Sequence, residues 1–444
     1  MRNVFVLGLD DTNEQELRSI RRREDCRFIR LLDHDAVRPR RGRCDFHALV
    51  RSAHAALARH DGAIDAIVGY LDFPSSALAG VLRNAYGLPG PSNDAIAKCE
   101  HKYWSRLEQR AAAPELVPRF CAVDPFRERA GHRIDLDFPF WIKPVKAHSS
   151  HLGFRISGPR DLERHIPEIR AKIGRFGRPF NQYLSYVPGA GGIAPVDGYW
   201  CIAEEIVSAG RQCTLEGYVH RGRVVSYGVV DSIRSGRHRS SFTRYQYPST
   251  LPERVRARMA AAAETIMARI GYDDAPFNME FYWHRRSDRL WVLEINARIS
   301  KSHCPLFRLV DGTSHHAVMV DLALGERPEF PHRQGAFQVA AKFMIRVYHD
   351  GTITRVPGEA ELARIETLYP EARVNLLVEE GARLAALPYQ DSYSFELAEL
   401  YLGARHEREL LEKYAVCRKI LEFDLVPAQP QAARRDGAEG AAAE

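Results

Sequence analysis

The chain lacks the sequence patterns of a secreted, membrane-spanning or zinc-stabilised protein. Its eight cysteines lie far apart and form no C-x-x-C pair, which argues against a disulfide framework or a structural zinc site and favours reduced thiols. No apolar run approaches the roughly 18 residues of a membrane helix, and the first residues do not form a secretory signal. We therefore expect a cytoplasmic protein without a membrane partner.

A strong charge of one sign is also missing. Lys and Arg number 63 against 57 Asp and Glu, a formal charge of +6. The arginine runs at 21–23 and 38–43 stand beside acidic residues, so a solvated surface is favoured over a nucleic-acid interface. A mildly positive field still suits anionic substrates, nucleotides included.

Apolar runs and helical stretches alternate in the first part of the chain, at 3–9, 28–32 and 63–69 for the expected strands. This order predicts an open parallel α/β domain over residues 1–112, with one helix over 93–112 that carries Lys102.

The rest of the chain mixes strands and helices without that regular order. Strands are expected near 140–143, 154–156, 200–207, 212–220 and 223–230, followed by a helix over 252–270 and a hairpin over 277–296. The class is therefore α/β and α+β. The expected units are a two-lobed domain (113–330, divided near 197), a small C-terminal α+β domain (331–426) and a disordered tail (427–444).

The hairpin carries the most informative side chains. Strand residues alternate between faces, so Asn278 and Glu280 share one side, as do Glu294 and Asn296. With the turn inside 285–289, Glu280 faces Glu294 and Asn278 faces Asn296. Opposed like charges destabilise a hairpin unless a cation lies between them, and Mg²⁺ prefers such oxygen ligands. Two ions about 4 Å apart could bridge phosphate oxygens. The alternative is an exposed hairpin whose glutamates face water.

Two further positions fit phosphate chemistry. Arg298 lies two residues beyond Asn296, within reach of a transferring phosphoryl group. Lys143 ends an apolar strand and precedes the small polar stretch 145–153, which could close over phosphates with backbone N–H groups and hydroxyls. A solvated cation is the alternative for Lys143. No G-x-x-x-x-G-K-[ST] motif is present, which excludes a P-loop.

These motifs, in this order, resemble the ATP-grasp superfamily over residues 1–330. The resemblance is to its carboxylate–amine ligases, such as D-alanine–D-alanine ligase and the bacterial dipeptide ligases, and to the related biotin carboxylases. It implies ATP as a substrate and two metal ions of the Mg²⁺ type, with Mn²⁺ as an alternative. The resemblance assigns metal binding to Glu280, Glu294 and Asn296, and catalytic roles to Arg298 and Lys143. It assigns ATP binding to Lys102, Lys143, Ser149, Ser150 and Gln212, and to the hinge residues Glu204, Glu205, Ile206 and Val207.

Two positions depart from the family pattern. Gln212 stands where relatives often have the acid that holds the ribose hydroxyls, and Glu216 is the nearest acid. The phosphate loop has only Gly153 where relatives have several glycines, so His148 or His151 is a candidate for the closed state.

Other polar clusters are interpreted more simply. His303, His315 and His316 lack metal-ligand spacing and are expected to be structural, and Cys201 and Cys213 to be buried. For the basic stretch 237–239, recognition of an anionic substrate and a flexible loop remain equal alternatives.

The resemblance implies a ligase that activates a carboxylate as an acylphosphate and joins it to an amine, with ADP and phosphate as products. Its partners are small-molecule substrates, and a homodimer is left open. The alternatives are a biotin carboxylase-type enzyme that makes carboxyphosphate from bicarbonate, and a nucleotide-binding protein without catalysis.

Overall fold

The computed structural model describes residues 1–21, 24–38, 44–128, 134–147, 151–207, 210–234, 241–387 and 394–428. His148, Ser149 and Ser150 of the expected phosphate loop lie outside the described residues, as do the basic stretch 237–239 and most of the expected tail.

The N-terminal unit is the predicted parallel α/β layer, with strand order β2-β1-β3 and both neighbours parallel to β1. Apolar side chains of β1 such as Val4 and Val6 are fully buried against the surrounding helices. The elements are β1 (Arg2–Leu7), α1 (Asp11–Arg18), β2 (Cys26–Leu31), α2 (His34–Val37), α3 (Phe46–Ala58), β3 (Ala66–Val68), α4 (Ser75–Tyr86), α5 (Asn93–Glu100) and α6 (Lys102–Ala112).

The single helix expected over 93–112 is in fact two helices, because His101 ends α5 and caps α6. The His101 side chain accepts a hydrogen bond from the backbone N–H of Trp104, and its other ring nitrogen lies 3.1 Å from the Val196 carbonyl. Its backbone is extended (φ −90°, ψ 101°), which breaks the helical path. The break places Lys102 at the first position of α6, where its N–H donates to the Val145 carbonyl.

The next unit is a four-stranded sheet in the order β4-β7-β5-β6; the helix α7 packs on it, whereas α8 packs into the core of the N-terminal unit. The helix α8 was not expected, since the glycines and the proline in 174–184 hide its periodicity. The elements are η2 (Pro114–Leu116), β4 (Phe120–Val123), β5 (Phe140–Pro144), β6 (Phe154–Ile156), α7 (Pro159–Lys172), α8 (Gly174–Leu184), η4 (Pro188–Ile193) and β7 (Cys201–Glu205).

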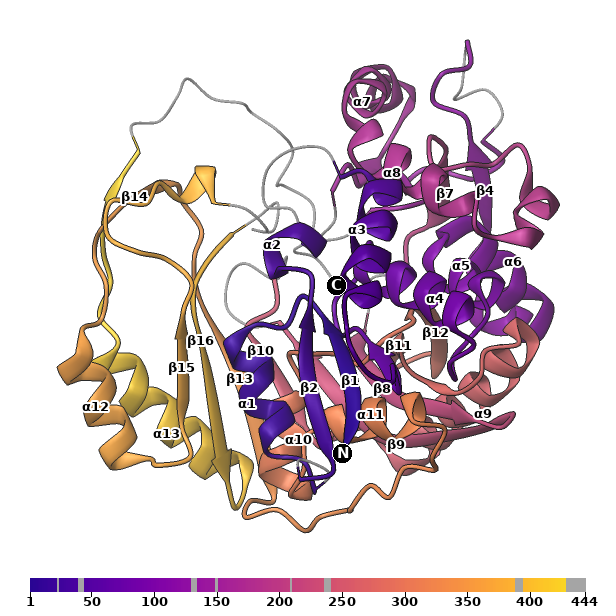
Figure 1. Ribbon diagram of the computed structural model, residues 1–444. Helices are drawn as coiled ribbons and strands as arrows, with labels where there is room; N and C mark the ends of the chain where they lie inside the picture. Colours follow the sequence, from indigo (N-terminus) through magenta and orange to yellow (C-terminus); the bar gives the residue numbers. More distant parts are fainter. Residues whose placement is uncertain are drawn as a thin grey trace.

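A large sheet with strand order β12-β11-β8-β9-β10-β13-β16-β15 forms the centre of the molecule (Figure 1). One face of its β8–β11–β12 end packs on α9 through apolar residues such as Leu215, Met279 and Met259. The elements are β8 (Arg211–His220), β9 (Arg223–Ile233), β10 (Arg244–Tyr247), α9 (Glu253–Ile270), β11 (Ala275–His284), β12 (Arg289–Asn296), α10 (Cys304–Asp311) and α11 (His316–Ala323).

The C-terminal residues extend this same sheet instead of forming a separate one. β13 pairs with β10, and β16 and β15 follow outward, with α12 and α13 beside them (Figure 1). The strands β14 and β17 form a two-stranded sheet of their own. The elements are β13 (Val339–Val347), β14 (Gly351–Arg355), α12 (Glu359–Leu368), β15 (Arg373–Leu376), η5 (Leu384–Ala386), β16 (Phe395–Ala404), α13 (Glu407–Ile420) and β17 (Asp424–Pro427).

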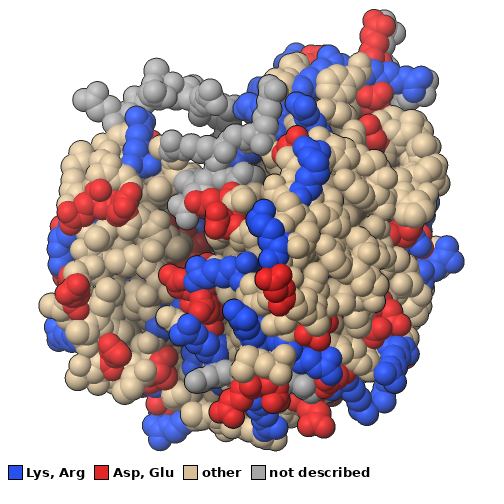
Figure 2. Space-filling model, viewed as in Figure 1, with Lys and Arg blue, Asp and Glu red and all other residues tan. Residues whose placement is uncertain are grey.

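The charged surface is mixed. In Figure 2 the basic and acidic side chains lie interspersed over the viewed face and do not separate into one basic field. Within the described residues, no helix combines the length and the apolar character of a membrane span.

Candidate active site

Two rows of polar side chains cross the strands β8, β11 and β12 on the face opposite α9. Glu280 pairs with Thr214 on one side and with Glu294 on the other, and Asn278 pairs with Glu216 and with Asn296. The alternation along Asn278-Met279-Glu280-Phe281 sends the apolar members into the α9 core and the polar ones to this face. The predicted opposition of Glu280 to Glu294 and of Asn278 to Asn296 is therefore observed.

A β-bulge produces this register. The last pair before the turn is His284 with Arg289, so the connection consists of residues 285–288. It is one residue shorter than the range 285–289 expected for the turn. Between the pairs Phe281–Val292 and Glu280–Glu294, β12 contains one extra residue, Leu293. The bulge shifts the register by one and brings the two glutamates opposite each other. Bulges next to active sites commonly re-aim a side chain in this way.

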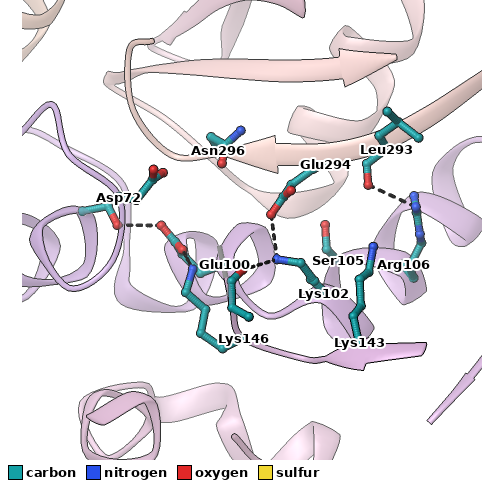
Figure 3. A network of polar contacts seen from close by, with 12 residues as sticks. Asp72, Glu100, Lys102, Ser105, Arg106, Lys143, Lys146, Leu293, Glu294 and Asn296 are labelled. Carbon is teal, nitrogen blue, oxygen red and sulfur yellow. Dashed lines mark hydrogen bonds and ion pairs between the residues drawn. The ribbon is translucent and has the colours of Figure 1, made fainter. Parts of the chain in front are cut away.

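Arg106 of α6 holds the bulge. Its guanidinium donates from Nη1 to the Val292 carbonyl (2.7 Å) and from Nη2 to the Leu293 carbonyl (3.0 Å). Figure 3 shows the contact with Leu293 beside Glu294. Buried carbonyls that have lost their ladder partners at a bulge are thereby satisfied.

The two opposed glutamates have different environments. Glu294 Oε1 accepts a hydrogen bond from Lys102 Nζ at 2.7 Å, and the two side chains point toward each other in Figure 3. Burial acts to raise the pKa of Glu294, but Lys102 and Lys143 outweigh it and the pKa is lowered. Burial and the charge of Glu294 together raise the pKa of Glu280 to about 7. Glu294 is thus ionised beside the lysines, whereas ionisation of Glu280 is disfavoured.

Glu204 connects two cations on the lysine side. Its carboxylate lies 2.6 Å from Lys143 Nζ and 2.5 Å from Arg106 Nε. Burial opposes ionisation, but Arg106 and Lys143 prevail and lower the pKa of Glu204 to about 2. The Glu204 side chain, which was expected at the nucleotide hinge, is thus buried in an ion pair, and its backbone lies in a strand paired on both sides.

The other expected hinge residues are the last residue of β7, Glu205, and the two residues after the strand. Glu205 N–H donates to the Arg119 carbonyl, so this N–H is already used. Ile206 and Val207 lie beyond the strand, and the Val207 N–H donates to no backbone carbonyl of the described residues. Gln212 donates to Glu280 Oε2 at 2.9 Å, while its own Oε1 atom is buried without a partner among the described residues. A buried acceptor of this kind suits a hydroxyl donor.

The remaining predicted residues are Asn296, in the row with Asn278 and Glu216, and Arg298, which follows β12. Asn296 Nδ2 donates to Asn278 Oδ1 at 2.9 Å, which leaves the Asn296 amide oxygen for another partner. Arg298 Nε lies 2.6 Å from Asp72 Oδ1, a contact from the loop that follows β3. Asp72 was not singled out from the sequence.

A cavity of about 170 Å³ lies on this face beside Glu280 and Arg298. Its walls come from β8, β9, β10, β11 and the segment after β12. The lining residues are Gln212, Thr214, Ser232, Phe242, Tyr245, Asn278, Glu280, Arg298, Ser300, Ser302 and His303.

The oxygen atoms at the end of the hairpin fit a hard divalent cation. Glu280, Glu294 and Asn296 would be its ligands, and a cation would offset the burial and the Glu294 charge that raise the pKa of Glu280. Within the described part of the chain, no group of three or more His, Cys, Asp or Glu side chains is arranged to hold a metal. Two carboxylates and one amide are an incomplete set, of the kind that Mg²⁺ completes with water and phosphate oxygens.

A second buried ion pair, between Lys146 and Glu100, lies near Lys102 (Figure 3). Lys146 contacts Glu100, whose other oxygen accepts from Ser76 Oγ at 2.6 Å. The Lys146 ammonium also lies 5.3 Å from the centre of the Phe73 ring. Neither this ion pair nor Arg106 was predicted from the sequence. For Arg106 there was a signal, because Lys102 and Arg106 have the i, i+4 spacing that places both on one helix face.

The histidines are buried and hydrogen-bonded as expected. His316 bonds to Ser314, His315 to Tyr227 and to the Ser300 carbonyl, and His303 to Glu216. Cys201 and Cys213 are also buried.

Comparison with known proteins agrees with this architecture. A family model described as "Carbamoyl-phosphate synthase L chain, ATP binding domain" matches residues 220–329, the segment with the hairpin and Arg298. The urea amidolyase of Lachancea kluyveri is 23% identical over 331 residues, which are 73% of this chain and 16% of that protein. The chain thus spans about a sixth of that relative.

Solved structures match over nearly the whole chain. The L-amino acid ligase of Bacillus licheniformis superposes with a TM-score of 0.71 at 17% identity, covering 97% of this chain and 99% of that one. The biotin carboxylase domain of the Hydrogenobacter thermophilus 2-oxoglutarate carboxylase gives 0.64 at 16% identity, covering 96% and 91%. The three-dimensional match and the ATP-binding family model together confirm the predicted ATP-grasp fold.

Proposed function

We propose that the protein is an ATP-dependent ligase that activates a carboxylate as an acylphosphate and joins it to an amine. The observation that carries this proposal is the opposition of Glu280 and Glu294, with lysines on one side and the Arg298 cavity on the other. Such a face can hold a triphosphate at one end and the reacting carboxylate at the other.

The residues have separate roles in this scheme. Lys102 and Lys143 bind phosphate oxygens of ATP, and the backbone after β7 contacts the adenine. Ser149 and Ser150 belong to the proposed phosphate loop, and Gln212 to the ribose contact. Mg²⁺ on Glu280, Glu294 and Asn296 would neutralise charge on the phosphates, with two ions expected and Mn²⁺ as a possible substitute.

Arg298 acts at the reacting end. A carboxylate oxygen attacks the γ-phosphorus and the bond to ADP breaks, which gives the acylphosphate and ADP. An amine then attacks the acyl carbon, the C–N bond forms, the acyl C–O bond breaks, and phosphate leaves with the proton lost by the amine nitrogen. Arg298 lies on the cavity wall, where it can bind the phosphoryl oxygens in both steps. Most of the rate enhancement comes from positioning and electrostatics.

The test is a screen for ADP release by the purified protein with ATP, Mg²⁺ and pairs of amino acids, with mass spectrometry of the product. The expected result is ADP and phosphate together with an amide. AMP as the product, or tight ATP binding without turnover over the whole panel, contradicts the proposal. Size-exclusion chromatography, with the same assay on each fraction, gives the oligomeric state of the active protein. A homodimer is one expectation.

A second candidate is the formation of carboxyphosphate from bicarbonate. It is favoured by the superposition on a biotin carboxylase domain whose crystals contain MgADP and bicarbonate. Bicarbonate-stimulated, biotin-dependent ADP release in the same screen selects this alternative.

A further inference from the structure

The cavity beside Arg298 has one wall whose chemistry the proposed function does not use. His303 lies on this wall, and its side chain is 3% exposed. Its Nδ1 atom lies 2.7 Å from Oε1 of Glu216, whose side chain is fully buried behind it. No partner of the other ring nitrogen, Nε2, is found among the described residues.

Charged and titratable groups surround this pair on several elements. Glu216 belongs to β8, and its Oε2 atom lies 3.7 Å from Nδ1 of His315, which also contacts Tyr227 of β9. The Tyr245 ring of β10 packs at 5.1 Å from the His303 ring. Lys342 of β13 and Arg298 are the cations that act on His303.

This arrangement is that of an oriented base. The Glu216 carboxylate accepts the Nδ1 hydrogen and fixes the ring, which leaves the Nε2 lone pair for the cavity. Burial, followed by Lys342 and Arg298, lowers the pKa of His303 to about 3, and burial raises the pKa of Glu216 to about 7. The pair is therefore a buried anion above about pH 7. Burial, Lys342 and Arg298 oppose a proton at Nε2, and the ionised Glu216 carboxylate is the group that balances the imidazolium charge during proton transfer.

We propose that His303 is the base that deprotonates the amine substrate in this cavity, with Glu216 as its positioning residue. The proposal rests on the proposed ligase function and assigns the amine to the Ser300–His303 side of the cavity. An amine that arrives as an ammonium ion transfers one proton to Nε2. The free amine attacks the acyl carbon and the C–N bond forms; phosphate leaves with the electron pair of the broken C–O bond and takes up the proton that the amine nitrogen loses on becoming an amide.

The first test compares two amines with the His303→Gln variant. Hydroxylamine is unprotonated at neutral pH and needs no base, whereas an amino acid needs one. With ATP, Mg²⁺ and each common amino acid as the carboxylate, we expect hydroxamate formation within about threefold of wild type and amide formation lower by about 10²–10⁴-fold. His332→Gln, at a side chain that is 74% exposed, is the matched control.

The outcomes separate the two proposals. Equal loss of hydroxamate and amide in His303→Gln, or no loss of either, overturns the base. Absence of hydroxamate with the wild-type protein overturns the ligase function and the base with it.

A second measurement uses the wild-type protein and does not depend on the folding of a variant. The amide rate should rise with pH up to about 7, the pKa of Glu216, because His303 is held in the correct orientation by the ionised carboxylate, and should then level off. A rate that keeps rising with pH, with no break, shows that the amine loses its proton in solution and overturns the proposal. Glu216→Gln should remove the break.

Discussion

The Nζ atom of Lys102 donates a hydrogen bond to Oε1 of Glu294 across 2.7 Å, although the two residues are 192 positions apart in the chain. Lys102 is also tied to the Ala147 carbonyl at 2.9 Å, at the start of the proposed phosphate loop. One ammonium group therefore links α6, that loop and the end of the hairpin. A metal on Glu294 would compete with this lysine, and a bound phosphate would give the lysine a new partner.

Replacement of Lys102 by Met should weaken the binding of ATP. A hydrogen bond to a charged group contributes about 1.5–3 kcal/mol, which corresponds to a roughly tenfold to hundredfold higher Kd. Calorimetric titration with a non-hydrolysable ATP analogue and Mg²⁺ measures this change. Lys172→Met, at a side chain 56% exposed on α7, is the control and should bind as wild type does. Equal affinity of all three proteins would remove Lys102 from the nucleotide site.

Glu294→Gln should abolish ADP formation while the fold is retained. The substitution keeps the size of the side chain but removes the charge that holds a metal, so we expect a loss of at least about 10²-fold in kcat. Thermal melting checks that the protein is folded. Glu264→Gln, on the exposed side of α9, is the matched control. Undiminished turnover in Glu294→Gln would be fatal to the site assignment.

Glu204→Gln should lower stability in a pH-dependent way. The pKa of Glu204 falls from 4.5 to about 2 on folding, so its stabilising charge is fully present above about pH 4.5 and is lost as the pH falls toward 2. Loss of one partner leaves Arg106 and Lys143 buried and uncompensated, at a cost of about 3 kcal/mol near neutral pH.

Denaturation midpoints of wild type and Glu204→Gln, measured from neutral pH down to about 4, test this sign. The gap between the two proteins should be constant near neutrality and shrink below about pH 4.5. The neighbouring Glu205→Gln is the control, since the Glu205 side chain is 39% exposed and such surface pairs contribute about 1 kcal/mol or less. A gap that widens in acid contradicts the assignment.

Arg298→Lys should reduce turnover by about 10²-fold, because a lysine cannot reproduce two-point contact with phosphoryl oxygens. Asp72→Asn should give a smaller loss of about tenfold, since Asp72 holds the guanidinium in place. Steady-state kinetics of ADP release measure both. Arg254→Lys, which pairs with Asp288 at the turn of the hairpin, should leave turnover unchanged. Equal activity of Arg298→Lys and wild type would exclude the proposed role.

The sequence was most informative where periodicity is strict. Alternation along 278–296 predicted the opposed glutamates, and the order of strands and helices predicted the fold that the comparisons confirm. The register was predicted from a symmetric turn, whereas a shorter connection and a bulge at Leu293 produce it. Local sequence contains no sign of that bulge, because a distant residue, Arg106, stabilises it.

Other features depend on tertiary contacts in the same way. The break at His101 requires the Val196 carbonyl, and the orientation of Arg298 requires Asp72. Glu204 resembles a hinge residue in sequence, but its side chain is directed inward by Arg106 and Lys143. The domain limits and the roles of the individual ATP and metal residues stay predictions.

The strands β13, β16 and β15 are hydrogen-bonded into the sheet that carries the hairpin, and β13 covers the outer edge of β10. A shortened protein that stops at residue 330 would expose the unpaired N–H and C=O groups of β10, together with Tyr247 and Phe307, which pack against Ala340 and Tyr401. Bare strand edges of this kind invite aggregation. The part of the molecule that carries the hairpin therefore cannot be excised at that point as a well-behaved fragment, and the proposed site has to be mapped with point substitutions in the whole chain.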